Sequence, residues 1–352
     1  MKKLHFALDP NTATLSENDS KKYFSTVGIA TFAFIAVTYG VSTLLFLLVG
    51  ALYPQALDSA VVSNVVSAIS QYAIAFPVLC TILGRLPKDT NPSEKMGGKA
   101  FWGTLCIAIA MMSVGNTVGN FVITLFENAM GRSMTNVVAE STVGSHWLVN
   151  LIFVAVLPPI LEELMFRKVL CDRLMPLGEG YAVVVSALIF GLAHGNLFQF
   201  FYAFLLGIVF ATVYIKTGRL RYTIVYHVII NLLGGVLVPW ILDALEPILN
   251  EENLARILEV TQSADAAAIE ALGAELMPFA LPMFAFLAYE VFYSVATVIG
   301  VVLIITWRKR ISFAKGLLPP AREGKVANVL CNGGVAAAIG AFTVIFMLSL
   351  LA

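Results

Sequence analysis

Residues 222–242 read YTIVYHVIINLLGGVLVPWIL and contain no Asp, Glu, Lys or Arg. A transmembrane helix needs about 20 predominantly apolar residues, so this run is long enough to cross a bilayer. Barrel strands would instead alternate over roughly ten residues. The sequence therefore predicts an all-α polytopic membrane protein with about nine transmembrane helices (eight to nine, because the fifth and sixth segments are short). The other apolar segments cover residues 27–52, 61–84, 101–126, 147–166, 180–195, 198–215, 278–307 and 328–351.

The composition supports the same class. Of the 352 residues, 59% are hydrophobic and 12% are charged, whereas a soluble domain usually carries about 25% charged residues. Because lipid offers no hydrogen-bond partners, the spanning elements should be helices. The lipid bilayer is the expected surrounding, no nucleic-acid partner is expected, and the oligomeric state is left open. A compact chain without sorting signals favours a bacterial plasma membrane.

The positions of Lys and Arg predict the orientation. With a cytoplasmic N-terminus and nine alternating segments, 20 of the 22 basic residues fall in cytoplasmic stretches, and only Arg132 and Arg256 lie outside. Cytoplasmic loops normally carry such an excess. We therefore expect a cytoplasmic tail at 1–26 and a single membrane domain at 27–352.

Within that domain, the expected catalytic core is 147–242, and the longest outer loop is 243–277. This loop is acidic and has the pattern of an amphipathic helical pair. It is either a solvated cap over the helix ends or a lid that binds substrate.

Ionisable residues inside a span cost about 2.5–3.5 kcal/mol or more, so they tend to be paired and functional. The fourth segment ends with LPPILEELMFR at 157–167. Glu163 and Arg167 are four residues apart, with the acid on the amino-terminal side, which favours an ion pair. That pair would leave Glu162, about 100° around the helix, as the reactive carboxylate. The alternative is an interfacial cluster that marks a helix end.

Polar residues also occur in the fifth and seventh segments. Phe190 and His194 share one helix face, and so do His227 and Asn231, which are also four residues apart. A lone membrane histidine is often only a packing residue, and a His/Asn pair can hydrogen-bond a neighbouring helix. Pro158 precedes the Glu162 cluster and is expected to kink that helix and leave carbonyl groups unpaired.

Taken in order, Glu162-Glu163-x-x-x-Arg167, Phe190-x-x-x-His194 and His227-x-x-x-Asn231 resemble the three motifs of the CAAX-protease and bacteriocin-processing (CPBP, or Abi) family of intramembrane metalloproteases. The resemblance covers about 70 residues. It implies peptide-bond hydrolysis within the membrane, on a peptide or a prenylated protein. It also implies that Glu162 and His194 activate water, that His227 and Asn231 stabilise the oxyanion, and that Glu163 and Arg167 buttress the site.

The need for a metal is left open by the residues. His194, His227 and Glu162 are a plausible set for a divalent ion such as zinc, with water as the fourth ligand. No HExxH motif is present, however, and Asn is a poor zinc ligand. A metal-free glutamate mechanism is equally compatible with the residues and is slightly preferred.

The depth of the three key residues presents a difficulty. At 1.5 Å per residue, Glu162 and His227 lie roughly 8–9 Å from the cytoplasmic ends of their helices, whereas His194 lies roughly 20 Å from its own. Straight, upright helices would keep them apart. Strong tilt, or a short hairpin whose turn at Gly195 stays within the membrane, would bring them together.

We therefore expect an intramembrane endopeptidase that acts on a membrane-associated, prenylated or leader-bearing substrate. Two alternatives come from other functional classes. A non-catalytic immunity or scaffold protein would bind another membrane protein through the same fold. A proton-coupled transporter would use intramembrane Glu and His residues as a proton relay, although no inverted repeat is visible.

Overall fold

The structure, a computed structural model, describes residues 3–263, 265–321 and 325–351. In these ranges the secondary structure is helical apart from two isolated β-bridges, so the predicted all-helical fold is confirmed. Lys2 and Arg322, two of the basic residues that predict the orientation, lie outside the described residues.

Eight helical runs in the described part of the chain are long and apolar enough to cross a membrane. The fifth predicted segment, 180–195, is α9 (Glu179–Ala193), which has only 15 residues and is about 22 Å long, short of a hydrocarbon core of about 30 Å. The candidate spans are Glu17–Leu52, Ala60–Leu83, Gly98–Met130, Trp147–Leu177, Leu197–Thr217, Leu220–Ile248, Ala266–Arg310 and Gly333–Leu350.

The spans and their connections are built, in chain order, from α1 (Glu17–Leu52), η1 (Pro54–Asp58), α2 (Ala60–Ala68), η2 (Ile69–Ala75), α3 (Phe76–Leu83), α4 (Gly98–Met130), α5 (Val137–Thr142), α6 (Trp147–Asn150), η3 (Leu151–Val156), α7 (Leu157–Glu163), η4 (Leu164–Cys171), α8 (Asp172–Leu174), η5 (Met175–Leu177), α9 (Glu179–Ala193), α10 (Leu197–Thr217), α11 (Leu220–Leu232), η6 (Leu233–Leu237), α12 (Val238–Leu245), η7 (Glu246–Ile248), α13 (Glu251–Ser263), α14 (Ala266–Leu276), η8 (Met277–Phe279), α15 (Ala280–Trp307), η9 (Arg308–Arg310), α16 (Lys325–Leu330) and α17 (Gly333–Leu351).

Three spans widen into a π-helical turn shortly before a proline. The turns η2, η3 and η6 end two residues before Pro77, Pro158 and Pro239, respectively. Proline has no N–H, and its ring collides with the carbonyl group four residues back. Widening the helix by one residue relieves that collision, and such turns are frequent at functional sites. All three π-turns belong to spans that contribute residues to the candidate site.

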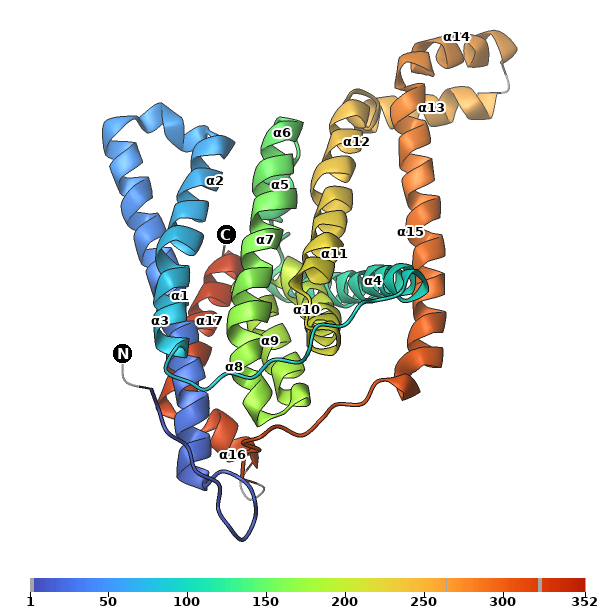
Figure 1. Ribbon diagram of the computed structural model, residues 1–352. Helices are drawn as coiled ribbons and strands as arrows, with labels where there is room; N and C mark the ends of the chain where they lie inside the picture. The colour runs from blue at the N-terminus through green and yellow to red at the C-terminus, as the bar shows by residue number, and fades with distance from the viewer. Residues whose placement is uncertain (1–2, 264, 322–324, 352) are drawn as a thin grey trace.

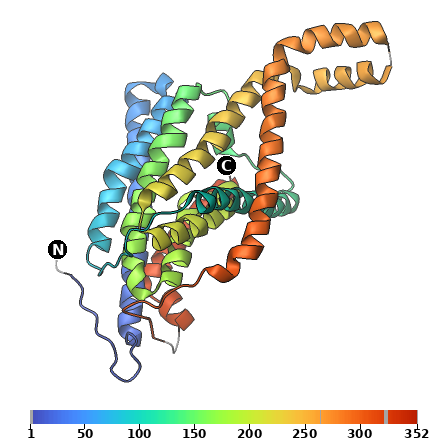
Figure 2. The same cartoon turned by 45° about the vertical axis from the view of Figure 1, so that its right-hand side comes forward.

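The spans are not a bundle of parallel helices (Figures 1 and 2). α1 packs against α17 and against the α2–α3 span, while α10 packs against α9 and α4. In both views α4 runs across α15 rather than alongside it. Close contact between α4 and α10 requires glycine, because a Cβ atom at Gly115 would lie 2.3 Å from Cα of Tyr202. The main core lies where α1, α3, η4, α9, α10 and α17 meet.

The segment 243–277 contains the two helices α13 and α14, which pack on each other and project beyond α12 and α15 (Figure 1). An ion pair between Arg256 and Glu275 joins them. Leu254, Leu258 and Ile269 on these helices are exposed.

At the opposite end of the molecule, two extended linkers cross the start of α9. Glu179 there is buried and accepts hydrogen bonds from Lys216, from the Asn91 side chain and from the backbone N–H of Ala314. Burial raises the pKa of Glu179, but these partners outweigh it and hold the pKa below its usual value. The carboxylate therefore fastens the linkers around residues 91 and 314 to the ends of α9 and α10.

Candidate functional site

Glu163 and Arg167 form the ion pair that their spacing predicts. Arg167 Nε donates to Glu163 Oε2 at 3.0 Å, and both side chains are fully buried. The two terminal nitrogens of Arg167 have no hydrogen-bond partner among the described residues. The guanidinium group instead lies 4.8 Å from the centre of the Phe190 ring and 5.8 Å from that of Phe210, so two aromatic faces stabilise its charge.

His227 lies between the two glutamates. Its Nδ1 is 3.1 Å from Glu163 Oε1, and its Nε2 is 3.8 Å from Glu162 Oε2. Because a carboxylate can only accept, Nδ1 carries the proton in the contact with Glu163. The second hydrogen bond of a histidine fixes its ring orientation and tautomer. Glu163 therefore fixes both Arg167 and His227, while Glu162 faces the other nitrogen of the ring.

His194 comes directly after the last residue of α9 and begins the turn into α10. Its Nδ1 donates to the Phe190 carbonyl oxygen at 2.8 Å, which leaves Nε2 as the free acceptor of a neutral ring. Glu162 and His227 both interact electrostatically with this imidazole. The Phe190 ring makes edge-to-face contacts with both histidines, with centroids 5.0 Å from His194 and 5.7 Å from His227. The three helices therefore converge on one site.

The turn at Gly195 explains how His194 reaches this site. Gly195 has a φ of +70°, a conformation that favours glycine. A Cβ atom added to it would lie 2.6 Å from Tyr39 Oη and 3.0 Å from Ile345. Tyr39 is near the middle of α1, so the turn lies inside the bundle of spans. Of the two solutions to the depth difficulty, the geometry fits the short hairpin.

Asn231 has a contact that its motif did not predict. Its Nδ2 donates to the Val154 carbonyl oxygen at 2.9 Å. In a regular helix that carbonyl group would accept the N–H of residue 158, which is a proline. Asn231 thus satisfies a carbonyl group that Pro158 leaves free, as expected for a kink inside protein. One amide hydrogen is used in this way, and the other remains available.

The described residues contain no group of three or more His, Cys, Asp or Glu side chains arranged to hold a metal ion. Each of the two site histidines already uses Nδ1, one on the Phe190 carbonyl group and the other on Glu163. This leaves Nε2 of each ring free, the arrangement in which a histidine can contact either a water molecule or a metal ion.

Residues 144–233, which contain all six predicted site residues, match the family model described as type II CAAX prenyl endopeptidase Rce1-like. This part of the chain is similar to the Rce1-like family. The resemblance inferred from the three motifs is thereby confirmed. The chain is 28% identical over 158 residues to YdiL of Bacillus subtilis (strain 168), which is described as a membrane peptidase. It is 37% identical over 87 residues to the membrane-embedded CAAX protease MroQ of Staphylococcus aureus (strain USA300).

These relatives share only part of their length with this chain. The match covers 44% of this chain and 64% of YdiL, and 22% of this chain and 35% of MroQ. No solved structure matches the chain. With eight candidate spans among the described residues and bacterial membrane relatives, the chain is an integral membrane protein, as predicted.

Tyr72 lies outside the Rce1-like core but contacts the site. It belongs to the π-turn η2, and its hydroxyl donates to Glu162 Oε1 at 3.0 Å. Sequence reasoning missed this residue because one tyrosine in an apolar span carries no motif. The only indirect signal was Pro77 five residues later.

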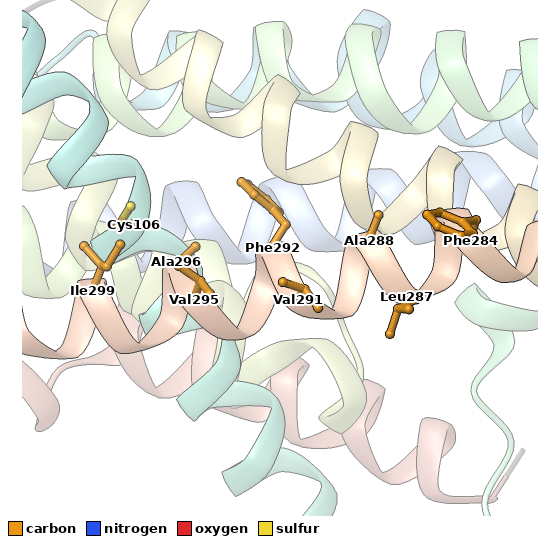
Figure 3. A pocket seen from close by; sticks show the side chains of 9 residues that line it. All are labelled: Cys106, Phe284, Leu287, Ala288, Val291, Phe292, Val295, Ala296 and Ile299. Atoms are coloured by element: carbon orange, nitrogen blue, oxygen red, sulfur yellow. The ribbon is translucent and has the colours of Figure 1, made fainter.

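The apolar groove of about 560 Å³ between α15 and α4 is not part of this site (Figure 3). Its lining consists of eight side chains of α15 together with Cys106 of α4. None of the predicted site residues lines it. A second apolar groove, of about 460 Å³, includes Leu192 and Leu197, which flank the His194 turn.

Proposed function

We propose that this protein is an intramembrane endopeptidase in which Glu162 and His194 activate a water molecule and His227 stabilises the oxyanion. The observation that supports this most is the position of His227, with Nδ1 on Glu163 and Nε2 3.8 Å from Glu162. A carboxylate and two imidazoles from three helices form a cluster suited to water activation.

The partners of the two histidines give them different chemistry. His194 donates Nδ1–H to a neutral carbonyl oxygen, so its Nε2 is a base that can orient water. His227 contacts a carboxylate on each side. A carboxylate facing each ring nitrogen favours a proton on that nitrogen. An Nε2–H of His227 would be a donor to developing negative charge.

Hydrolysis would begin when Glu162 accepts a proton from water. The water oxygen bonds to the carbonyl carbon of the substrate as the C=O electron pair moves to oxygen. That oxyanion accepts a hydrogen bond from His227 Nε2–H, with the free N–H of Asn231 as a second donor. The carbonyl group re-forms, the C–N bond breaks, and the proton passes from Glu162 to the leaving amine. One oxyanion donor can be worth about 10²–10³ in rate.

The proposed substrate is a peptide or a lipidated protein that approaches within the membrane. The apolar groove of about 460 Å³ beside the His194 turn supports this choice, because an alkyl or prenyl chain could lie there. We further propose that the reaction uses no metal, because a carboxylate beside an imidazole can activate water directly.

Quantitative proteomics of amino- and carboxyl-terminal peptides tests this function. Membranes with the wild-type protein and membranes with Glu162→Gln or His194→Ala at equal abundance are compared. Termini that appear only with the wild type would support the peptidase and identify its substrate. Identical termini, together with a biological effect that survives Glu162→Gln, would favour the non-catalytic alternative. Uptake into liposomes driven by a pH gradient would favour the transporter.

A further inference from the structure

Tyr72 is the only described residue outside residues 144–233 with a side-chain hydrogen bond to one of the six predicted site residues. Its hydroxyl donates to Glu162 Oε1 at 3.0 Å. The other carboxylate oxygen, Oε2, is the one that lies 3.8 Å from His227. Tyr72 therefore holds one oxygen of Glu162, and the other oxygen faces His227.

The direction of Tyr72 depends on the π-turn in which it lies. The N–H of Phe76 donates to the Gln71 carbonyl oxygen, five residues back. One additional residue in a helical turn rotates the rest of the helix by about 100°. The span Ala60–Leu83 thus presents Tyr72 to α7 while Leu79 and Leu83 remain in the core with α1. This rotation accounts for the contact between the Tyr72 hydroxyl and the Glu162 carboxylate.

A phenolic O–H that donates to a carboxylate does two things. It holds one oxygen in place, and it stabilises the charged form of the acid. A general base needs both, because it must be ionised and must point its free lone pair at water. The other groups that face Glu162 are His227, His194 and Tyr202, of which the last two interact with it electrostatically.

We propose that Tyr72 is a positioning residue for Glu162, holding Oε1 so that Oε2 is free to accept a proton from the attacking water. This rests on the proposed peptidase function. In this arrangement the catalytic site extends beyond the Rce1-like core to the second span. Tyr72 acts through Glu162 and does not contact the substrate.

The first test needs no substrate. The carboxyl stretch of Glu162 is followed by infrared difference spectroscopy during a pH titration of the purified full-length protein, with Glu162→Gln to assign the band. In Tyr72→Phe the carboxylate loses a hydrogen bond to its charged form, so its protonation midpoint should move up by about one pH unit. Tyr23→Phe is the matched control, because its hydroxyl donates to the Arg173 carbonyl oxygen. An unchanged midpoint in Tyr72→Phe would overturn the proposal.

The second test uses cleavage of an internally quenched peptide that ends in a farnesylated CAAX sequence. Tyr72→Phe should lower kcat about tenfold, leave KM nearly unchanged and move the acidic limb of the pH profile upward, whereas Tyr23→Phe should do none of these. A rise in KM alone, or wild-type kcat, would contradict the positioning role. If the wild type cleaves nothing and proteomics finds no new termini, the peptidase function fails, while the titration still decides the Tyr72–Glu162 contact.

Discussion

Glu163 and His227 are joined by a hydrogen bond of 3.1 Å between Oε1 and Nδ1, inside a region from which water is largely excluded. The same carboxylate holds Arg167 through its other oxygen. One buried acid therefore orients a histidine and neutralises an arginine. The first prediction depends on these two contacts of Glu163.

Glu163→Gln should destabilise the protein by about 3–5 kcal/mol, because it leaves the buried Arg167 without its counter-ion. It should also abolish most activity, since His227 loses the partner that fixes its ring. The double variant Glu163→Leu with Arg167→Met should regain much of the stability, because an apolar pair can replace a buried ion pair. Thermal unfolding in micelles and cleavage assays measure the two effects. Full activity in the double variant would contradict the orienting role of Glu163.

Asn231→Ala should cost about 1–3 kcal/mol, because the Val154 carbonyl group loses its donor in a partly buried setting. Adding Pro158→Ala supplies a backbone N–H four residues after Val154, so the double variant should recover stability, as thermal unfolding would measure. If Asn231 also donates to the oxyanion, activity stays low in the double variant. Recovery of both stability and activity in the double variant would assign Asn231 to the helix kink alone.

Gly195→Ala should lower activity at least tenfold. The φ of +70° costs a non-glycine residue about 1–2 kcal/mol, and the new Cβ atom would lie 2.6 Å from Tyr39 Oη. Adding Tyr39→Phe removes that oxygen and should restore part of the activity. Gly180→Ala is the control, because nothing lies within 4 Å of its Cβ position. Equal losses of activity in Gly195→Ala and Gly180→Ala would show that the turn at Gly195 does not position His194.

The Glu179 contacts should make stability depend on acid pH. Because its pKa is lowered in the folded protein, the stability it contributes is present above the pKa of the unfolded chain, about 4.3. That contribution is lost as pH falls through the lower folded value. Glu179→Gln should therefore lower Tm at pH 7 and flatten the decline of Tm between about pH 5 and pH 3. A Tm profile parallel to that of the wild type would rule out this contribution.

Metal removal separates the two mechanisms that the residues allow. If water activation uses Glu162 and His194 without a metal, dialysis against EDTA and 1,10-phenanthroline should leave kcat unchanged. Metal analysis of the purified active protein by mass spectrometry should then find less than about 0.1 equivalent of zinc per chain, an amount too small to account for the activity. Loss of activity that zinc restores would overturn the metal-free proposal.

Much of the site was predictable because it depends on spacing within one helix. Residues four apart lie on the same face, so the Glu163–Arg167 pair could be predicted from the sequence, and with it the choice of Glu162 as the free carboxylate. The apolar runs likewise predicted the spans to within a few residues at most ends. The start of α1 was missed by ten residues, because Glu17, Asp19, Lys21 and Lys22 are polar although they continue the same helix from its Ser16 cap.

Contacts between helices were beyond the sequence alone. The position of His227 between two glutamates depends on how α11 crosses α7, and the reach of His194 depends on where the turn at Gly195 packs against Tyr39. Tyr72 and Val154 entered the site through π-turns, which rotate side chains by an amount that apolar periodicity does not record.

The sequence by itself determined that this chain is a set of apolar helices carrying one acid pair, two histidines and an asparagine in a peptidase-like order. Hydrophobic length and helical spacing are local properties, so they can be read along the chain. Only the tertiary structure decided which nitrogen of His227 meets which glutamate and which tyrosine holds Glu162. Those contacts depend on the relative placement of different spans, which no single stretch of sequence contains.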